Sequence, residues 1–247
     1  MKEVQSSKQE ILPTPKVVGK IVLDNLSVEE LFRMVAHDML VFERRNTFIT
    51  IPDSYRRRII KTKPKNPVWY SQIIKGVSGL EYLILCGTPS YSDFKKNGVS
   101  YSIVGLYKSN GLMSAIMPYN NGFFGYYPHH FFERYKERKL GDLNIPTRDA
   151  IVQYFSNTTL NMPAKQDNPT YPNGVFSANE EGVCLGTIEE IDGKKHLIMK
   201  TFITVEMLRG GQVSLNADLQ EKILKVYESN YEMMQARQYS PAESYKA

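Results

Sequence analysis

Residues 81–119 read EYLILCGTPSYSDFKKNGVSYSIVGLYKSNGLMSAIMPY, and this stretch decides the fold. Three segments in it, 81–87, 100–107 and 112–119, are rich in Tyr, Ile, Val and Leu, as strands are. Asn97-Gly98 and Asn110-Gly111 separate these segments, and this dipeptide tolerates the positive φ angles of tight hairpin turns. The stretch therefore predicts an antiparallel meander.

Helical patterns lie on both sides of the meander. Ser27 and Glu30 form a capping box, and apolar residues then recur every three or four positions, which predicts a helix over 28–45. Further helices are predicted over 128–140, from Thr147, and from Asn216 as an N-cap.

A second set of hairpins follows the middle of the chain. Strands are predicted near 174–178, 182–190 and 195–203, and Asp192-Gly193 joins the last two. Strands and helices grouped in this way predict an α+β fold, with antiparallel β-sheets and flanking helices in a single composite domain.

The composition of the 247 residues fits an ordinary folded protein, because 42% are hydrophobic and 23% are charged. Four parts are predicted in chain order. They are a flexible N-terminal arm over 1–20, an N-terminal α/β portion with the meander over 21–120, a C-terminal α+β portion with a His/Arg helix over 121–238, and a frayed tail over 239–247.

Membrane, secretory and metal classes lack support in the sequence. No apolar run approaches the ~20 residues that cross a bilayer, so a cytoplasmic protein without a membrane partner is expected. Cys86 and Cys184 lie far apart in apolar segments, which predicts two buried, inert thiols. No cofactor and no metal are predicted, and zinc-protease, P-loop and α/β-hydrolase motifs are absent from the sequence.

Positive charge is concentrated in the first part of the chain. Residues 1–150 carry 22 Lys/Arg against 14 Asp/Glu, or +8, whereas residues 151–247 carry 9 against 12, or −3. The densest segment has Trp69 and Tyr70 just beyond it, and it supplies six candidate nucleic-acid contacts: Arg56, Arg57, Arg58, Lys61, Lys63 and Lys65. Cations interleaved with aromatic rings suit single-stranded nucleic acid, although a mobile basic loop without a partner gives the same pattern.

Three residues on the helix predicted over 128–140 are candidates for a catalytic site. His130, Arg134 and Arg138 are four residues apart, which places them on one stripe of a helix. A histidine can exchange a proton and arginines can hold a phosphate, so the stripe suits metal-independent cleavage of RNA through its own 2′-hydroxyl. Intrahelical pairing of the arginines with Glu133 and Glu137 is the alternative interpretation.

The stretch from His130 to Arg138, continuing through Leu140-Gly141-Asp142 into the helix at 147–155, resembles the His-x-x-x-Arg-x-x-x-Arg helix of domains related to barnase/RelE-type ribonuclease toxins. The resemblance implies that His130, Arg134 and Arg138 are active-site positions and that an antiparallel sheet follows. The long β-rich N-terminal portion departs from those small toxins.

Lys200 is a further candidate for the same cleft. If side chains alternate strictly along the strand predicted near 195–203, Lys200 lies on the same face as Phe202 and Thr204. Thr201 and Ile203 then lie on the opposite face.

The functional expectation is a metal-independent endoribonuclease or an RNA-binding protein, with RNA and a protein inhibitor or assembly partner as candidate partners. The alternative is a non-catalytic accessory or virion-associated protein of a phage or mobile element, which would use the same surface for protein contacts.

Overall fold

The computed structural model describes residues 25–45, 51–65, 68–88, 90–119, 122–158, 162–166, 172–179 and 181–239, with the backbone alone for 44–45, 100, 162 and 226–239. The predicted arm over 1–20 and the tail beyond Tyr239 lie outside the described residues. The fold is α+β, as the sequence predicts.

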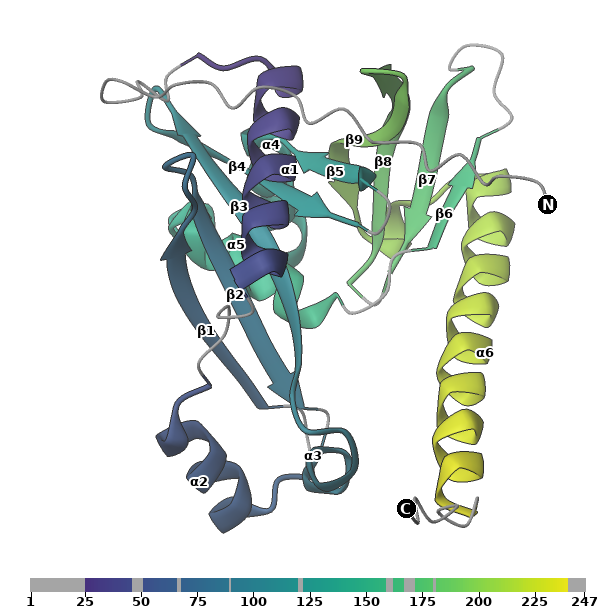
Figure 1. Cartoon of the computed structure of the whole chain (residues 1–247). Coiled ribbons are helices and arrows are strands. Elements are labelled where there is room, and N and C mark those ends of the chain that lie inside the picture. Colours follow the sequence, from purple (N-terminus) through teal and green to yellow (C-terminus); the bar gives the residue numbers. More distant parts are fainter. Residues whose placement is uncertain are drawn as a thin grey trace, which may run out of the picture.

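The elements follow one another in mixed order along the chain (Figure 1). The helices are α1 Val28–Arg45, α2 Asp53–Thr62, α3 Tyr91–Asn97, α4 His129–Tyr135, α5 Thr147–Asn157 and α6 Gly211–Tyr239, with a π-helical turn η2 Lys136–Leu140 and a 3-10 turn η3 Val205–Met207. The strands are β1 Val68–Lys75, β2 Glu81–Thr88, β3 Ser100–Ser109, β4 Leu112–Pro118, β5 Phe124–Tyr127, β6 Met162–Lys165, β7 Gly174–Ala178, β8 Val183–Ile191 and β9 Lys194–Ile203.

The strands of the described residues form one sheet in the order β1-β2-β3-β4-β5-β9-β8-β7-β6. All neighbours are antiparallel except β5 and β9, which run parallel and are joined at Gly125–Leu197 and Tyr126–Ile198. Two antiparallel runs of consecutive strands therefore meet at one parallel seam. The domain boundary predicted at 120/121 falls between β4 and β5, which are paired neighbours.

Helix α1 covers one face of the sheet over the first run of strands (Figure 1). The predicted capping box is confirmed, because Ser27 Oγ accepts the Glu30 amide at 3.2 Å and the Ser27 amide donates to Glu30 Oε2 at 2.8 Å. Leu31 and Val35 are buried and pack in a cluster with the sheet residue Ile84. The predicted period of apolar residues thus corresponds to the buried stripe of α1.

A buried carboxylate fastens α1 to the turn between β1 and β2. Asp38 is fully buried, and it accepts the Ser78 amide at 3.0 Å and the Tyr82 hydroxyl at 2.7 Å. The Ser78 hydroxyl also donates to it. Gly76 lies so close that a Cβ there would overlap the Asp38 carboxylate, which explains a glycine at this position.

The opposite face carries α4 and α5 on an aromatic core. Phe131, Tyr154 and Phe202 are fully buried and meet edge to face, with Phe131 and Tyr154 ring centroids 5.3 Å apart and Phe131 and Phe202 6.2 Å apart. Tyr127 of β5 joins them, with its ring 5.2 Å from that of Phe131. This cluster spans the seam, because Tyr127 lies on one run of strands and Phe202 on the other.

Helix α6 covers the second run on the same side of the sheet as α1, through Leu219 and Ile223 packed with Phe176 and Ile203. The N-cap predicted at Asn216 is wrong, since α6 begins at Gly211 and Asn216 lies buried within it. Its side-chain Oδ1 is buried and has no hydrogen-bond partner among the described groups.

Several elements differ from the sequence prediction. The basic segment lies largely in the helix α2, and Asn97-Gly98 ends the helix α3 instead of turning a hairpin, with Gly98 at φ 72°. Strands β1, β5 and β6 were not predicted. The turns at Asn110-Gly111 and Asp192-Gly193 are confirmed, since all four residues have positive φ.

Both cysteines are free and buried, as predicted. Burial raises the pKa of the Cys86 thiol, and it raises the pKa of the Cys184 thiol to about 12. Among the described residues, no helix is both long enough and apolar enough to cross a bilayer.

Candidate nucleic-acid interface

The His/Arg helix is anchored by its aromatic side. Phe131, Phe132 and Tyr135 are buried in the core, so α4 presents its other side to solvent. His130 and Arg134 are exposed there. The part of the chain that the structure describes gives His130 no hydrogen bond or ion pair.

The helix predicted over 128–140 is present, but only His129–Tyr135 is α-helical and Lys136–Leu140 form a π-helical turn. A π turn holds more residues than an α turn, so Arg138 no longer follows the α-helical spacing of His130 and Arg134. Lys136 is turned inward as a result. It is buried, with its Nζ 2.7 Å from Glu133 Oε1 and 3.3 Å from the carbonyl of Leu143.

The two arginines have different partners. Arg134 Nη1 donates to Glu137 Oε2 at 2.6 Å, and this hydrogen bond holds the pKa of Glu137 below its ordinary value. Arg138 Nη1 donates to the carbonyl of Phe202 at 2.6 Å and lies 3.3 Å from Thr201 Oγ1. The structure therefore engages the two guanidinium groups at separate places.

Arg138 completes the hydrogen bonding of a strand. The last register pair between β5 and β9 is Tyr126–Ile198, so the end of β9 has no strand beside it on that side. The Arg138 guanidinium supplies a donor to this edge at Phe202, which is itself fully buried. A backbone carbonyl left without a donor would lower stability.

We expect Arg138→Ala to lower the free energy of unfolding by about 1–3 kcal/mol, because a charged donor to a buried strand is lost. Arg134→Ala is expected to change it by less than about 1 kcal/mol, since its ion pair with Glu137 is half exposed. Urea denaturation of both variants measures the difference. Equal effects would contradict the structural role of Arg138.

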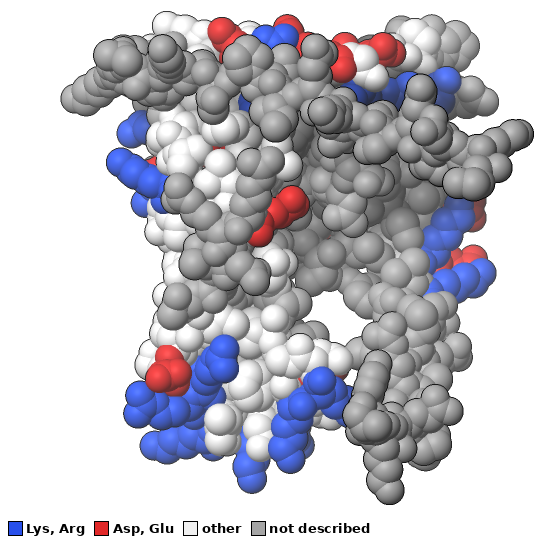
Figure 2. Space-filling view, viewed as in Figure 1, with Lys and Arg blue, Asp and Glu red and all other residues white. Residues whose placement is uncertain are grey.

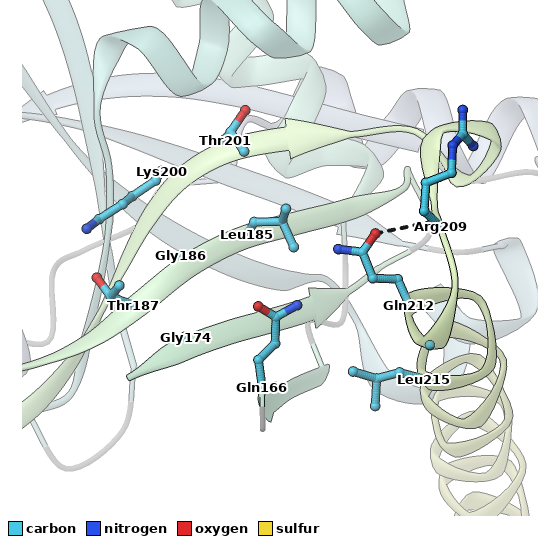
Figure 3. Close-up of a pocket in the computed structure, with 11 residues that line it drawn as sticks. Gln166, Gly174, Leu185, Gly186, Thr187, Lys200, Thr201, Arg209, Gln212 and Leu215 are labelled. Carbon is cyan, nitrogen blue, oxygen red and sulfur yellow. Dashed lines mark hydrogen bonds between the residues drawn. The ribbon is translucent and has the colours of Figure 1, made fainter. Parts of the chain in front are cut away.

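Lys200 lies beside a hollow of about 690 Å³ between the sheet and the start of α6 (Figure 3). The alternation predicted for its strand is wrong, because Leu185 pairs with Thr201 and Gly186 with Met199. Lys200 is the extra residue of a β-bulge, and it is exposed whereas Phe202 is fully buried.

The hollow does not bring its cations together. Lys200 Nζ lies 3.9 Å from Glu189 Oε1, and Arg209 donates to the carbonyl of Glu206 at 3.1 Å. Figure 3 shows these two cations at opposite ends, with the side chains of Gln212 and Leu215 near the Arg209 end. None of His130, Arg134 and Arg138 lines this hollow.

The six basic residues predicted to contact nucleic acid lie on α2 and the residues just after it, next to α3. All six are exposed, and α3 adds Lys95 and Lys96. We call this set of eight the basic pole: Arg56, Arg57, Arg58, Lys61, Lys63, Lys65, Lys95 and Lys96. In Figure 2, Lys and Arg gather at the end of the molecule where Figure 1 places α2 and α3.

The basic pole is held rigidly against the sheet. Tyr55 on the inner side of α2 donates to the carbonyl of Val68 at 2.6 Å, and its ring lies 5.6 Å from that of Tyr70. The amide of Tyr91 at the start of α3 donates to the carbonyl of Pro64 at 2.8 Å, which links the two helices. The cations are therefore fixed in position relative to one another by their backbones.

The charge of the basic pole is not neutralised within the described part of the chain. No described carboxylate pairs with any of its eight cations, whereas elsewhere Arg33 pairs with two carboxylates and Arg148 with one. Its own elements contain Asp53 and Asp93, and Asp93 serves as the partner of the N-cap Ser90. Such a surface attracts polyanions over distances of about a Debye length.

Comparison of the chain with family models, with curated proteins and with solved structures finds no match. The structure brings together the six basic residues chosen from the sequence. It places His130 and Arg134 on the exposed side of α4, whereas Arg138 is bound to β9 and Lys200 lies beside the hollow at the start of α6. Two cations of the pole, Lys95 and Lys96, were missed. Their signal was the capping pattern Ser90-x-x-Asp93, which starts the helix α3 that carries these lysines.

Proposed function

We propose that this protein binds RNA and that the basic pole is the surface that contacts the phosphate backbone. The observation that carries the proposal is the set of eight exposed cations without carboxylate partners on two adjacent helices. Each cation that neutralises a phosphate releases a condensed counterion, which makes such a surface bind strongly at low salt.

The shape of α2 favours a nucleic acid over a membrane surface as the polyanion. Its apolar residues Tyr55 and Ile59 are buried against the sheet, and Ile60 alone among its large apolar residues is exposed. A helix that lies in a membrane interface needs an apolar face free to insert. The outward side of α2 offers cations instead.

Cleavage of RNA by His130, Arg134 and Arg138 remains a separate expectation. In this structure Arg134 donates to Glu137 and Arg138 to the carbonyl of Phe202, so a phosphate would have to share or displace these partners. Binding at the basic pole requires no such rearrangement, and we therefore propose binding as the function.

The test measures the affinity for a labelled single-stranded RNA oligonucleotide over a range of salt concentrations. Compared with wild type, the triple variant Arg57→Ala, Lys61→Ala, Lys96→Ala is expected to lower the slope of log K against log salt by about 2, because each single-strand phosphate contact contributes about 0.7. This corresponds to about a 100-fold loss of affinity at ~0.1 M salt.

The matched control removes three exposed lysines from other parts of the chain: Lys165→Ala, Lys195→Ala, Lys222→Ala. It changes the net charge equally and is expected to keep the slope. Equal losses in both triple variants, or no salt-dependent binding by wild type, would refute the proposal. Analysis of the same samples on a denaturing gel in excess EDTA, together with His130→Ala and Arg134→Ala, tests cleavage.

A further inference from the structure

Tyr101 lies at the start of β3, next to the helix α3 of the basic pole. Tyr70, Cys86 and Tyr101 stand opposite one another on β1, β2 and β3, so their side chains lie on one face of the sheet. Helix α2 packs on this face at the Tyr70 end through Tyr55. Tyr101 follows α3 by a few residues and lies two strands, about 10 Å, from Tyr70.

The Tyr101 side chain is open and without a partner. It is 59% exposed. The other exposed large apolar side chains of the described residues are aliphatic or Met, so Tyr101 is the aromatic one in this set. The structure gives it no hydrogen bond and no ring contact with a described residue. Its register partner on β2, Cys86, is fully buried, so the exposed part of this row begins at Tyr101.

A rigid ring beside unpaired cations is the combination that recognises unpaired bases. In a duplex the faces of the bases are covered by their neighbours, whereas in a single strand each base has a face free to stack on an aromatic side chain. Cations bind the phosphates of single strands and of duplexes alike, so cations by themselves do not distinguish the two. The ring of Tyr101 therefore adds a contact that only a single strand can use.

We propose that the RNA held by the basic pole is single-stranded and that a base stacks on Tyr101. This inference rests on the proposed function and adds the class of RNA to it. The phosphates lie along the cations of α2 and α3, and an unpaired base turns toward the open ring at the start of β3.

The experiment compares affinities for a single-stranded RNA and for the same sequence as a duplex. Tyr101→Ala is expected to weaken single-strand binding by about 5- to 150-fold, the range that loss of one base–aromatic stack produces. It should leave duplex binding and the salt slope unchanged, because no charge is removed.

Two further substitutions separate stacking from loss of bulk. Tyr101→Phe keeps the ring and is expected to bind as wild type does, whereas Tyr101→Leu keeps an apolar side chain suited to packing and should bind as weakly as Tyr101→Ala. Leu112→Ala, which removes a half-exposed apolar side chain at the start of β4, serves as the control and should change nothing.

The possible outcomes distinguish this inference from the proposed function. Salt-dependent RNA binding that Tyr101→Ala and Tyr101→Leu leave unchanged would overturn stacking and leave the basic pole as the binding surface. Equal losses for single strand and duplex would also overturn it. Absence of RNA binding by wild type would overturn both proposals.

Discussion

Replacement of Asp38 by alanine is expected to lower the free energy of unfolding by about 2–5 kcal/mol, because three buried donors, the Ser78 amide and hydroxyl and the Tyr82 hydroxyl, lose their acceptor. The Ser78 amide and the Tyr82 hydroxyl both donate to this carboxylate, and Asp38, Tyr82 and Ser78 are all buried. Urea denaturation followed by circular dichroism measures the change.

Tyr82→Phe is the matched control for Asp38→Ala. It removes one donor and leaves Asp38 with both Ser78 contacts, so a loss of about 1 kcal/mol is expected. If Asp38→Ala cost no more than Tyr82→Phe, the carboxylate would not be the fastening between α1 and the sheet.

Phe131→Ala is expected to destabilise the protein by about 3–5 kcal/mol, because a large buried ring is replaced by a cavity. Phe131 is fully buried, and its ring meets those of Tyr127, Tyr154 and Phe202. Since these partners come from β5, α5 and β9, the cavity would loosen contacts on both sides of the parallel seam. Thermal and urea unfolding of the variant measure the effect.

Phe131→Leu is the comparison that isolates the volume of the ring. Leucine fills much of the space, so its cost is expected to be clearly smaller than that of alanine. An alanine variant as stable as wild type would show that the core around α4 collapses without loss, contrary to the close packing of these rings.

The sequence predicted the elements whose local chemistry agrees with their final environment. The capping box at Ser27 and Glu30 starts α1, and the positive φ values at Asn110 and Asp192 close hairpins where their residue types indicate. These signals act within a few residues, so no distant part of the chain changes their outcome.

The missed elements depend on partners distant in the sequence. Strand β5 is four residues long and gains its second neighbour from β9. In α2 the three consecutive arginines obscure the spacing of the two residues that face the sheet, Tyr55 and Ile59. Local periodicity cannot reveal a strand or helix whose apolar face is defined by tertiary contacts.

The predictions for the candidate site also differ in whether local sequence signals were sufficient. The basic residues at 56–65 could be chosen from charge density alone, and the structure places them together on one surface. The stripe of His130, Arg134 and Arg138 assumed an unbroken α-helix, and the bulge at Lys200 broke the assumed alternation of β9. A π turn and a β-bulge each shift the register by one residue, which residue patterns do not indicate.

The parallel seam has a consequence for how the sheet is assembled. Within each antiparallel run, paired strands are also consecutive in sequence, so their closure involves short loops. The pairing of Gly125 with Leu197 instead encloses the whole of α4, α5 and the second run of strands. Loop-closure entropy grows with the length enclosed, so this joint is the most costly of the sheet to close. The protein therefore consists of two regions of low contact order joined by one long-range pairing, and the slowest step of its folding is expected to be the formation of that pairing.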